Sequence, residues 1–189
     1  MSYSKAFLAE VSHLMIYEVG GWVNVKNPVF INGTNPKACG YVDDPSDPGG
    51  ETKYGIAKND NPDVNIANLN WNMAQAIYYN RYWLPGHCDQ LPPSVGSYHM
   101  DGCVNNGVGT AAKFLQQAVG ITPDGSVGPE TIAAVNAQDP ITTCNNICNI
   151  RLQYYQNIIN NNPSETKYLV GWDRRINEMK TFVEIPGNF

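Results

Sequence analysis

Two carboxylates mark the ends of a stretch that runs from Ile16 to Ile56. Glu18 stands at the end of a helical pattern, directly before Val19-Gly20-Gly21-Trp22. Asp47 lies in Asp44-Pro45-Ser46-Asp47-Pro48-Gly49-Gly50, where two prolines and two glycines predict a shaped turn. Hydrolysis of a glycosidic bond requires one carboxylic acid as proton donor and a second carboxylate that attacks the sugar or activates water. The pair therefore suits that chemistry.

The position of Glu18 favours the role of the acid. Its apolar neighbours predict partial desolvation, and the negative end of the helix dipole disfavours a carboxylate there, so both effects should raise its pKa. Thr52 can orient a water or hydrogen-bond the second acid. Asp43 and Asp44 are alternatives to Asp47 as the second carboxylate. Spacing alone also allows Glu18 to be a surface residue and the aspartates to stabilise turns.

A helix over residues 3–18 would position Glu18, because five apolar residues fall on one face: Phe7, Leu8, Val11, Leu14 and Met15. Ser2 or Ser4 can cap its start, and Gly20-Gly21 can end it. Residues 22–43 are irregular, with a β-hairpin expected around Asn32-Gly33. Residues 52–56 can add a short strand beside that hairpin.

The rest of the chain predicts helices almost to its end. Apolar residues from Met73 to Trp83 mark one helix, which Pro85-Gly86 stops. Further helices are expected at 93–106, 111–119, from 128 onward, 141–159 and about 165–182. The predicted fold class is therefore mainly α, in the α+β sense, as a helical bundle with a small N-terminal β-hairpin lobe.

Composition excludes several classes of protein. The chain has 189 residues and a formal net charge of −5, without a basic patch, so we expect no binding to nucleic acid. No apolar run approaches the roughly 18 residues that a membrane-spanning helix needs, so no membrane insertion is expected. The N-terminus lacks the pattern of a signal peptide.

The thiols and imidazoles do not predict a metal site. The odd number of cysteines argues against a complete disulfide framework, so we expect buried, reduced thiols, although a bridge that forms after export stays open. The cysteines are Cys39, Cys88, Cys103, Cys144 and Cys148. Cys144 and Cys148 lie one helical turn apart without a CxxC or HxxxH partner. We expect no metal and no cofactor, and structural roles for His13, His87 and His99.

Both ends of the opening stretch resemble the N-terminal motif of glycoside hydrolase family 108. In that family an E-G-G-aromatic run leads into a D-P-x-D-x-G-G-x-T-x-x-G-I block, which Glu18 to Trp22 and Asp44 to Ile56 follow. Later segments resemble the rest of the family, including its predicted peptidoglycan-binding half: 79–83, 101–107, 114–120, 124–131 and 171–175. Val19 replaces the first glycine, and 28 residues separate Glu18 from Asp47, more than in the family.

The resemblance implies an N-acetylmuramidase with a lysozyme-like fold. It makes Glu18 the catalytic acid and gives Asp47 and Thr52 the other two catalytic roles. Tyr54, Asp101 and Asn105 become candidates for substrate binding. The extra loop, about residues 23–42, is expected to lie along the cleft. Residues 1–92 would form the catalytic half and residues 93–189 the helical peptidoglycan-binding half, packed with it as one globular unit.

The expected substrate is the glycan strand of peptidoglycan, cut at the β-1,4 bond between N-acetylmuramic acid and N-acetylglucosamine by a monomer. The enzyme would be made in the bacterial cytoplasm and reach the wall by holin-type release, virion delivery or secretion. Two alternatives stay open. One is a lytic transglycosylase, in which Glu18 works alone and yields a 1,6-anhydro sugar. The other is a non-catalytic, wall-binding component of a virion.

The Asp-Gly-x-x-Gly-Pro-x-Thr segment at 124–131 is explained equally well as a turn and helix start.

Overall fold

The fold is described from a computed structural model, which covers residues 3–18, 41–44, 49–185 and 187–189; for residues 16–18 it covers the backbone. Contacts within the chain define two units. The helical unit comprises Met1–Glu10 and Arg81–Phe189, and the hairpin unit comprises Val11–Asn80. The expected division at residues 92 and 93 stays a prediction.

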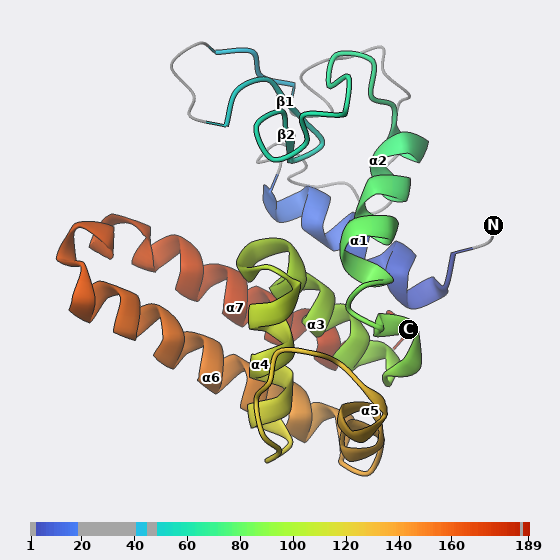
Figure 1. Cartoon of the computed structure of the whole chain (residues 1–189), viewed down its shortest axis with the longest axis vertical. Helices are drawn as coiled ribbons and strands as arrows, with labels where there is room; N and C mark the ends of the chain where they lie inside the picture. The colour runs from blue at the N-terminus through green and yellow to red at the C-terminus, as the bar shows by residue number, and fades with distance from the viewer. Residues whose placement is uncertain (1–2, 19–40, 45–48, 186) are drawn as a thin grey trace. The chain divides into compact units, whose positions relative to one another are not determined.

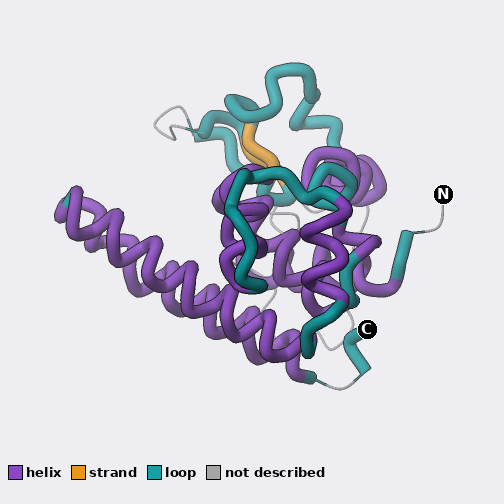
Figure 2. Tube along the Cα trace, turned by 60° about the horizontal axis from the view of Figure 1, so that its bottom comes forward, coloured by secondary structure: helices purple, strands orange, loops and turns teal. Residues whose placement is uncertain are grey.

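Helices α3 to α7 build most of the described part of the helical unit (Figure 1). They are α3 (Pro93–Asn106), α4 (Val108–Ala118), α5 (Pro129–Asn136), α6 (Pro140–Asn161) and α7 (Leu169–Glu184). Two short 3-10 helices, η3 (Cys88–Gln90) and η4 (Pro163–Tyr168), connect parts of this unit. Because η4 is a tight connection, α6 and α7 run back along one another as a long pair (Figures 1 and 2).

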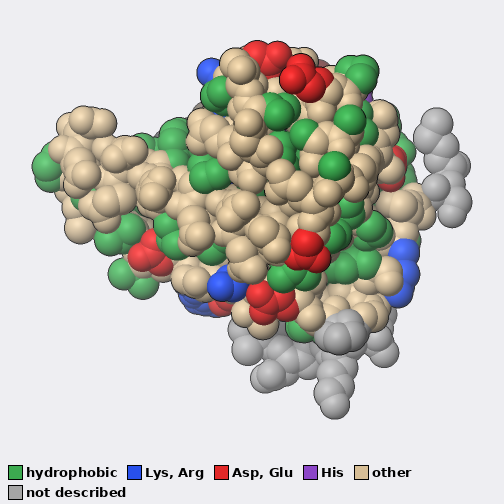
Figure 3. All heavy atoms as spheres, turned by 90° about the horizontal axis from the view of Figure 1, so that it is seen from below, with side chains coloured by type: hydrophobic (Ala, Val, Ile, Leu, Met, Phe, Trp, Pro, Cys, Tyr) green, Lys and Arg blue, Asp and Glu red, His purple; other side chains and the backbone are tan. Residues whose placement is uncertain are grey.

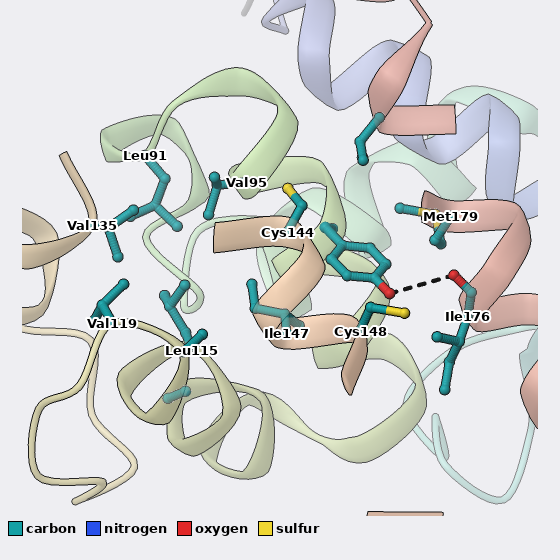
Figure 4. Packing of buried hydrophobic residues seen from close by; sticks show 14 of the residues in the cluster. Leu91, Val95, Leu115, Val119, Val135, Cys144, Ile147, Cys148, Ile176 and Met179 are labelled. Atoms are coloured by element: carbon teal, nitrogen blue, oxygen red, sulfur yellow. Dashed lines mark hydrogen bonds between the residues drawn. The ribbon is translucent and has the colours of Figure 1, made fainter. Parts of the chain in front are cut away.

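Apolar side chains from these helices form one hydrophobic cluster (Figure 4). Val95 of α3, Leu115 of α4, Ile147 of α6 and Ile176 of α7 are all buried within it. The Tyr98 hydroxyl, buried in the same cluster, donates a hydrogen bond to the carbonyl oxygen of Ile176 at 3.4 Å. Complete burial of one such aliphatic side chain contributes roughly 1.5–3 kcal/mol, so this cluster dominates the stability of the unit.

The N-terminal helix α1 (Lys5–Glu18) begins directly after Ser4, one of the two expected caps, and two residues later than the expected range of 3–18. The Ser4 hydroxyl accepts a hydrogen bond from the Phe7 amide at 3.3 Å, which is the expected cap. Phe7 is fully buried, and its ring meets that of Trp83 edge-on at a centroid distance of 5.4 Å. The helix extends to Glu18, so the residue lies in its final turn, as predicted.

The hairpin unit holds a two-stranded antiparallel sheet of β1 (Thr52–Lys53) and β2 (Ile56–Ala57). Thr52 pairs with Ala57, and Lys53 pairs with Ile56. The two turn residues have positive φ angles, 55° at Tyr54 and 72° at Gly55, as a tight two-residue hairpin requires. The stretch predicted as one short strand is therefore a hairpin by itself. The hairpin expected around Asn32-Gly33 lies outside the described residues.

The helix expected from Met73 to Trp83 changes its type on the way. It begins as α2 (Trp71–Tyr78), where the Asn70 side chain accepts a hydrogen bond from the Met73 amide at 3.0 Å. From Tyr79 to Trp83 the chain continues as a π-helical turn, η2. Such turns are rare and frequently lie at functional sites. The predicted class, mainly helical with a small antiparallel β element, is confirmed.

Candidate active site

Glu18 and Asp47 are the two expected catalytic carboxylates. The backbone of Glu18 belongs to the last turn of α1, and its position in the sequence places it in the hairpin unit. Its side chain and the whole of Asp47 lie outside the described residues. Their roles therefore stay predictions. The alternatives Asp43 and Asp44 are described, and both have exposed side chains.

Thr52 is held firmly at the start of β1. Its amide donates to the carbonyl oxygen of Val42 at 2.8 Å, and its own carbonyl accepts from the Val42 amide at 2.9 Å. Its hydroxyl donates to the carbonyl oxygen of Gly50 at 3.0 Å. A hydroxyl that donates one hydrogen bond still has lone pairs that can accept another. Thr52 can therefore accept a hydrogen bond from a water or from a protonated carboxyl group.

Tyr54 occupies the hairpin turn and is almost completely buried. Its ring lies against Trp71 at a centroid distance of 5.7 Å. Its carbonyl oxygen accepts a hydrogen bond from the hydroxyl of Tyr78 at 2.9 Å. The contacts tie the hairpin to α2, so Tyr54 determines the shape of the turn. Binding of substrate by Tyr54 stays a prediction.

Asp101 and Asn105 belong to the helical unit, on α3. The Asp101 carboxylate is 1% exposed and accepts a hydrogen bond from Arg151 Nη1 at 2.6 Å, within a buried ion pair. The Asn105 amide donates to the other Asp101 oxygen at 3.1 Å. Because the Asp101 carboxylate is occupied by these partners, its position is that of a supporting residue. Direct contact of Asp101 or Asn105 with substrate stays a prediction.

A second carboxylate, Glu10, lies in the same buried region and was not singled out from the sequence. Burial raises the pKa of Glu10 well above its ordinary value, and the negative charge of Asp101 adds to this increase. Burial also raises the pKa of Asp101, against the opposing effects of Arg151 and Asn105. The sequence did contain a signal, because Glu10 falls on the apolar face of α1, one turn from Phe7 and Leu14.

The segment at 124–131 forms a hydrogen-bonded loop around Gln116. One oxygen of Asp124 accepts from the Gln116 side chain at 2.6 Å and from the Ser126 amide at 2.8 Å. Gln116 Oε1 accepts a hydrogen bond from the Gly125 amide at 2.9 Å, and Gln116 Nε2 donates to the Thr131 hydroxyl at 3.2 Å. The polar groups of this segment therefore stabilise the turn and the start of α5, as the structural interpretation predicts.

Three further observations concern the surface and the side-chain clusters of the described residues. Lys and Arg side chains lie singly or in very small groups on the face drawn in Figure 3, without a broad basic patch. Among the described residues, no group of three or more His, Cys, Asp or Glu side chains has an arrangement that can hold a metal ion. In the same part of the chain, no helix has the length and apolar character needed to cross a membrane.

Comparisons with known proteins match both parts of the chain. Residues 34–107 match the family Glycosyl hydrolase 108, and residues 110–177 match the family Predicted Peptidoglycan domain. The structure is similar to that of SagA from Brucella abortus, with a TM-score of 0.71 and 26% sequence identity. This similarity covers 94% of the present chain and 92% of the SagA chain. A search of curated proteins finds no match.

The first matched segment is therefore similar to glycoside hydrolase family 108, and a segment similar to a predicted peptidoglycan domain follows it directly. The expected lysozyme-like, mainly α fold is confirmed. The chain is a glycoside hydrolase, and the pair of domains supports peptidoglycan as its substrate. The family match includes Asp47, Thr52, Tyr54, Asp101 and Asn105, whereas Glu18 precedes it.

Proposed function

We propose that this peptidoglycan hydrolase is an N-acetylmuramidase that cuts the β-1,4 bond between N-acetylmuramic acid and N-acetylglucosamine. The observation that carries the proposal is the Glycosyl hydrolase 108 match, followed directly by a peptidoglycan domain. Glu18 protonates the glycosidic oxygen as the bond breaks. Its place in the final turn of α1 supports this role, since the helix dipole there disfavours the ionised acid.

Asp47 is the second carboxylate in this proposal. It stabilises the positive charge that develops on the sugar, or it activates the attacking water. Thr52 accepts a hydrogen bond from that water or from the protonated acid. Its fixed position on β1 and its remaining acceptor capacity support the role. Asp43 and Asp44 are tested as alternatives, because both lie close to Asp47 in the sequence and have exposed side chains.

We assign the remaining candidates by their surroundings. Tyr54 shapes the hairpin that carries Thr52, and its contribution to binding passes through that shape. Asp101 holds the side chains of Arg151 and Asn105 in place. Of these three residues, Asn105 is only partly buried, so its side chain can contact a ligand. Replacement of Asn105 by Ala should therefore raise KM for peptidoglycan while kcat changes little; an unchanged KM would remove Asn105 from the binding site.

Muropeptide analysis of purified variants tests the reaction. Glu18→Gln should lower the rate of glycan cleavage by about 10²–10⁴-fold, with an unchanged circular dichroism spectrum. Asp47→Asn should have a comparable effect, whereas Asp43→Asn and Asp44→Asn should not. Glu130→Gln is the matched control, since Glu130 is exposed on α5 in the helical unit. Full activity of Glu18→Gln would overturn the assignment of the acid.

The products distinguish hydrolysis from the alternative reaction. A muramidase leaves a free reducing N-acetylmuramic acid, which borohydride reduces, whereas a lytic transglycosylase leaves a 1,6-anhydro end. We expect mass spectrometry to find the reducible product. If 1,6-anhydro ends dominate, the enzyme is a transglycosylase. Proton NMR of the anomer that forms first, recorded before mutarotation, establishes retention or inversion.

We propose lysis of a host cell or penetration of its wall as the biological role. The enzyme would reach the wall by holin-type release, virion delivery or secretion. Addition of purified protein to cells with a permeabilised outer membrane should lower their turbidity, and Glu18→Gln should not. A binding component without catalytic activity would sediment with peptidoglycan but leave the turbidity unchanged.

A further inference from the structure

Two cysteines that are distant in the sequence meet at one point of the helical unit. Cys88 opens the 3-10 helix η3, and Cys103 lies in the last part of α3. A Cβ atom placed on Gly86 would lie 3.0 Å from the sulfur of Cys88 and 3.1 Å from that of Cys103. Both sulfurs therefore lie against the same bare backbone position, and the two thiols are hydrogen-bonded to each other.

The pair is chemically asymmetric. The hydrogen bond from Cys88 lowers the pKa of Cys103 to about 5, with His99 acting in the same direction. His99 Nε2 lies 3.6 Å from the Cys103 sulfur, one helical turn earlier on α3. Burial raises the pKa of Cys88, so the Cys88 thiol stays protonated and is the donor of the hydrogen bond to Cys103. A thiolate next to a thiol is the arrangement from which thiol–disulfide exchange proceeds.

Glycines hold the two elements in close approach. A Cβ atom on Gly96 would lie 2.6 Å from the carbonyl oxygen of Cys88, so glycine at that position lets η3 lie directly on α3. A Cβ atom on Gly86 would lie 2.8 Å from the carbonyl oxygen of Tyr82, in addition to its close contacts with both sulfurs. Larger residues at either position would separate the cysteines. Glycine at both positions therefore allows the close approach of the two thiols.

Access to the pair requires a local opening. Both thiols are buried, although His87 and Asp89 on either side of Cys88 are exposed. His87 has a φ angle of 54°, which is uncommon for a residue with a side chain. The element η3 is three residues long, so its opening disturbs few hydrogen bonds. Displacement of η3 would expose Cys88 and the neighbouring Cys103 to solvent.

We infer that Cys88 and Cys103 are a redox-responsive pair that closes to a disulfide when the protein meets a disulfide oxidant such as oxidised glutathione. The Cys103 thiolate attacks one sulfur of the oxidant, whose sulfur–sulfur bond breaks and releases one thiolate. Cys88 loses its proton to solvent and attacks the Cys103 sulfur of the mixed disulfide. The second thiolate then leaves, so two protein thiols are oxidised and one oxidant disulfide is reduced to two thiols.

The other described cysteines provide an internal comparison. Cys144 and Cys148 lie one turn apart on α6 and are also buried and free. Burial raises the pKa of Cys144 to about 12, so this thiol stays protonated. A buried and protonated thiol is a poor nucleophile. The pair at 88 and 103 therefore differs from Cys144 in its reactivity, although all these thiols are buried.

Closure of the bond joins η3 to α3 within the helical unit. The link constrains the unfolded chain over residues 88–103 and so stabilises the folded state. If the enzyme acts on the wall outside the cytoplasm, as proposed above, it would be reduced where it is made and oxidised where it works. That timing rests on the proposed function, whereas the chemistry of the pair does not.

The test begins with reduced, full-length protein incubated with oxidised glutathione and then alkylated and digested. We expect a cross-linked peptide pair that joins Cys88 to Cys103. The oxidised protein should unfold at a temperature higher by roughly 5–10 °C, and dithiothreitol should reverse the shift. Cys88→Ser and Cys103→Ser should each abolish the cross-link and the shift. Cys144→Ser is the matched control and should keep both.

Two further measurements keep the proposal falsifiable. In the first, the wild-type protein is alkylated with iodoacetamide at pH 6.5 in a series of low urea concentrations. Cys103 should be labelled before Cys144. This result does not depend on whether the serine variants fold. Glu18→Gln should form the same cross-link, so loss of catalysis and loss of the disulfide are distinguishable. Absence of the Cys88–Cys103 cross-link under oxidation, including in low urea, would overturn the inference, as would labelling of Cys144 first.

Discussion

The hairpin unit and the helical unit are stabilised in different ways. Around the hairpin, side chains hydrogen-bond to main-chain oxygens: Lys53 to Ala67 at 3.0 Å, Lys58 to Val64 at 2.7 Å and Asn61 to Ala57 at 2.8 Å. The hairpin unit also buries apolar side chains, among them Ile66, Leu69 and Ala74, whereas the helical unit combines an apolar cluster contributed by several long helices with a buried ion pair. The residues proposed for catalysis belong, by their position in the sequence, to the first of these regions.

The difference predicts unequal resistance to opening. A hydrogen bond contributes about 0.5–1.5 kcal/mol, or 1.5–3 kcal/mol when one partner is charged, and much of it is lost locally when a segment opens. A packed cluster is lost only when several helices separate. We therefore expect the free energy of opening, measured by amide hydrogen exchange, to be lower for the hairpin than for α3 and α6.

The largest effect is expected from Arg151→Met in the helical unit. This change removes the partner of Asp101 and leaves a buried carboxylate uncompensated, which costs about 3–5 kcal/mol of unfolding free energy. Urea unfolding followed by circular dichroism measures the change. The matched control is Arg174→Met, because the Arg174 side chain is 69% exposed in its contact with Glu178, and an exposed pair contributes about 0.5 kcal/mol or less. Equal effects of the two changes would contradict the difference in burial.

In the hairpin unit, the strongest effect should follow Lys53→Met. Lys53 is 7% exposed, and its ammonium donates to Ala67 and lies 5.9 Å from the ring centroids of both Tyr41 and Tyr54. Loss of the charged hydrogen bond should cost about 1.5–3 kcal/mol.

Hydrogen exchange measured by mass spectrometry shows which segments lose stability in Lys53→Met. Peptides from residues 49–70 should exchange faster in Lys53→Met, whereas peptides from α3 and α6 should not. Lys113→Met, at an exposed position of α4, is the control and should change neither set. Faster exchange throughout the chain would show that the two regions open together.

A smaller effect is expected from Gly55→Ala. Gly55 has a φ angle of 72°, which costs a residue with a side chain about 1 kcal/mol. Gly171→Ala is a control of opposite sign, because Gly171 lies in α7 with open space around its Cα and alanine favours a helix by roughly 0.5–1 kcal/mol. Thermal unfolding measures both. Destabilisation by Gly171→Ala would contradict this account.

The sequence predicted local structure well where local signals decide it. The helix expected at 93–106 is α3 with the same bounds, since Pro93 can begin a helix and Gly107 can end one. Ser4 caps α1 as expected. The π-helical turn at Tyr79–Trp83 was missed, because the apolar pattern is almost the same for both kinds of helix.

Contacts between distant residues carried no comparable signal. Asp101 and Arg151 are 50 residues apart in the sequence, and neither spacing nor composition pairs them. The meeting of Cys88 with Cys103 likewise depends on how η3 packs against α3. For the catalytic site, the motif supplied the candidates Glu18, Asp47 and Thr52. Of these, Thr52 is the one whose side-chain geometry is described.

Glu10 offers a prediction about pH. The carboxyl is fully buried, and neither oxygen has a hydrogen-bond partner among the described residues. Asp101, Arg151 and Arg175 are the charged groups that act on it, and the combined effect raises its pKa because burial dominates. The folded protein therefore binds the proton of Glu10 more tightly than the unfolded chain, whose Glu pKa is about 4.3.

The sign of the stability change follows from this difference. Between the unfolded and the folded pKa of Glu10, the folded state holds more protons, so its contribution to stability is complete below about pH 4.3 and falls as pH rises. Glu10→Gln resembles the protonated acid and should remove this decline. Urea unfolding from pH 5 to pH 8 should therefore give a flatter profile for Glu10→Gln than for the wild type. Parallel profiles, or a variant that is less stable at pH 8, would show that Glu10 is ionised and stabilised by Arg175 or Arg151. The helical unit would then hold two buried carboxylates that are both compensated by arginine.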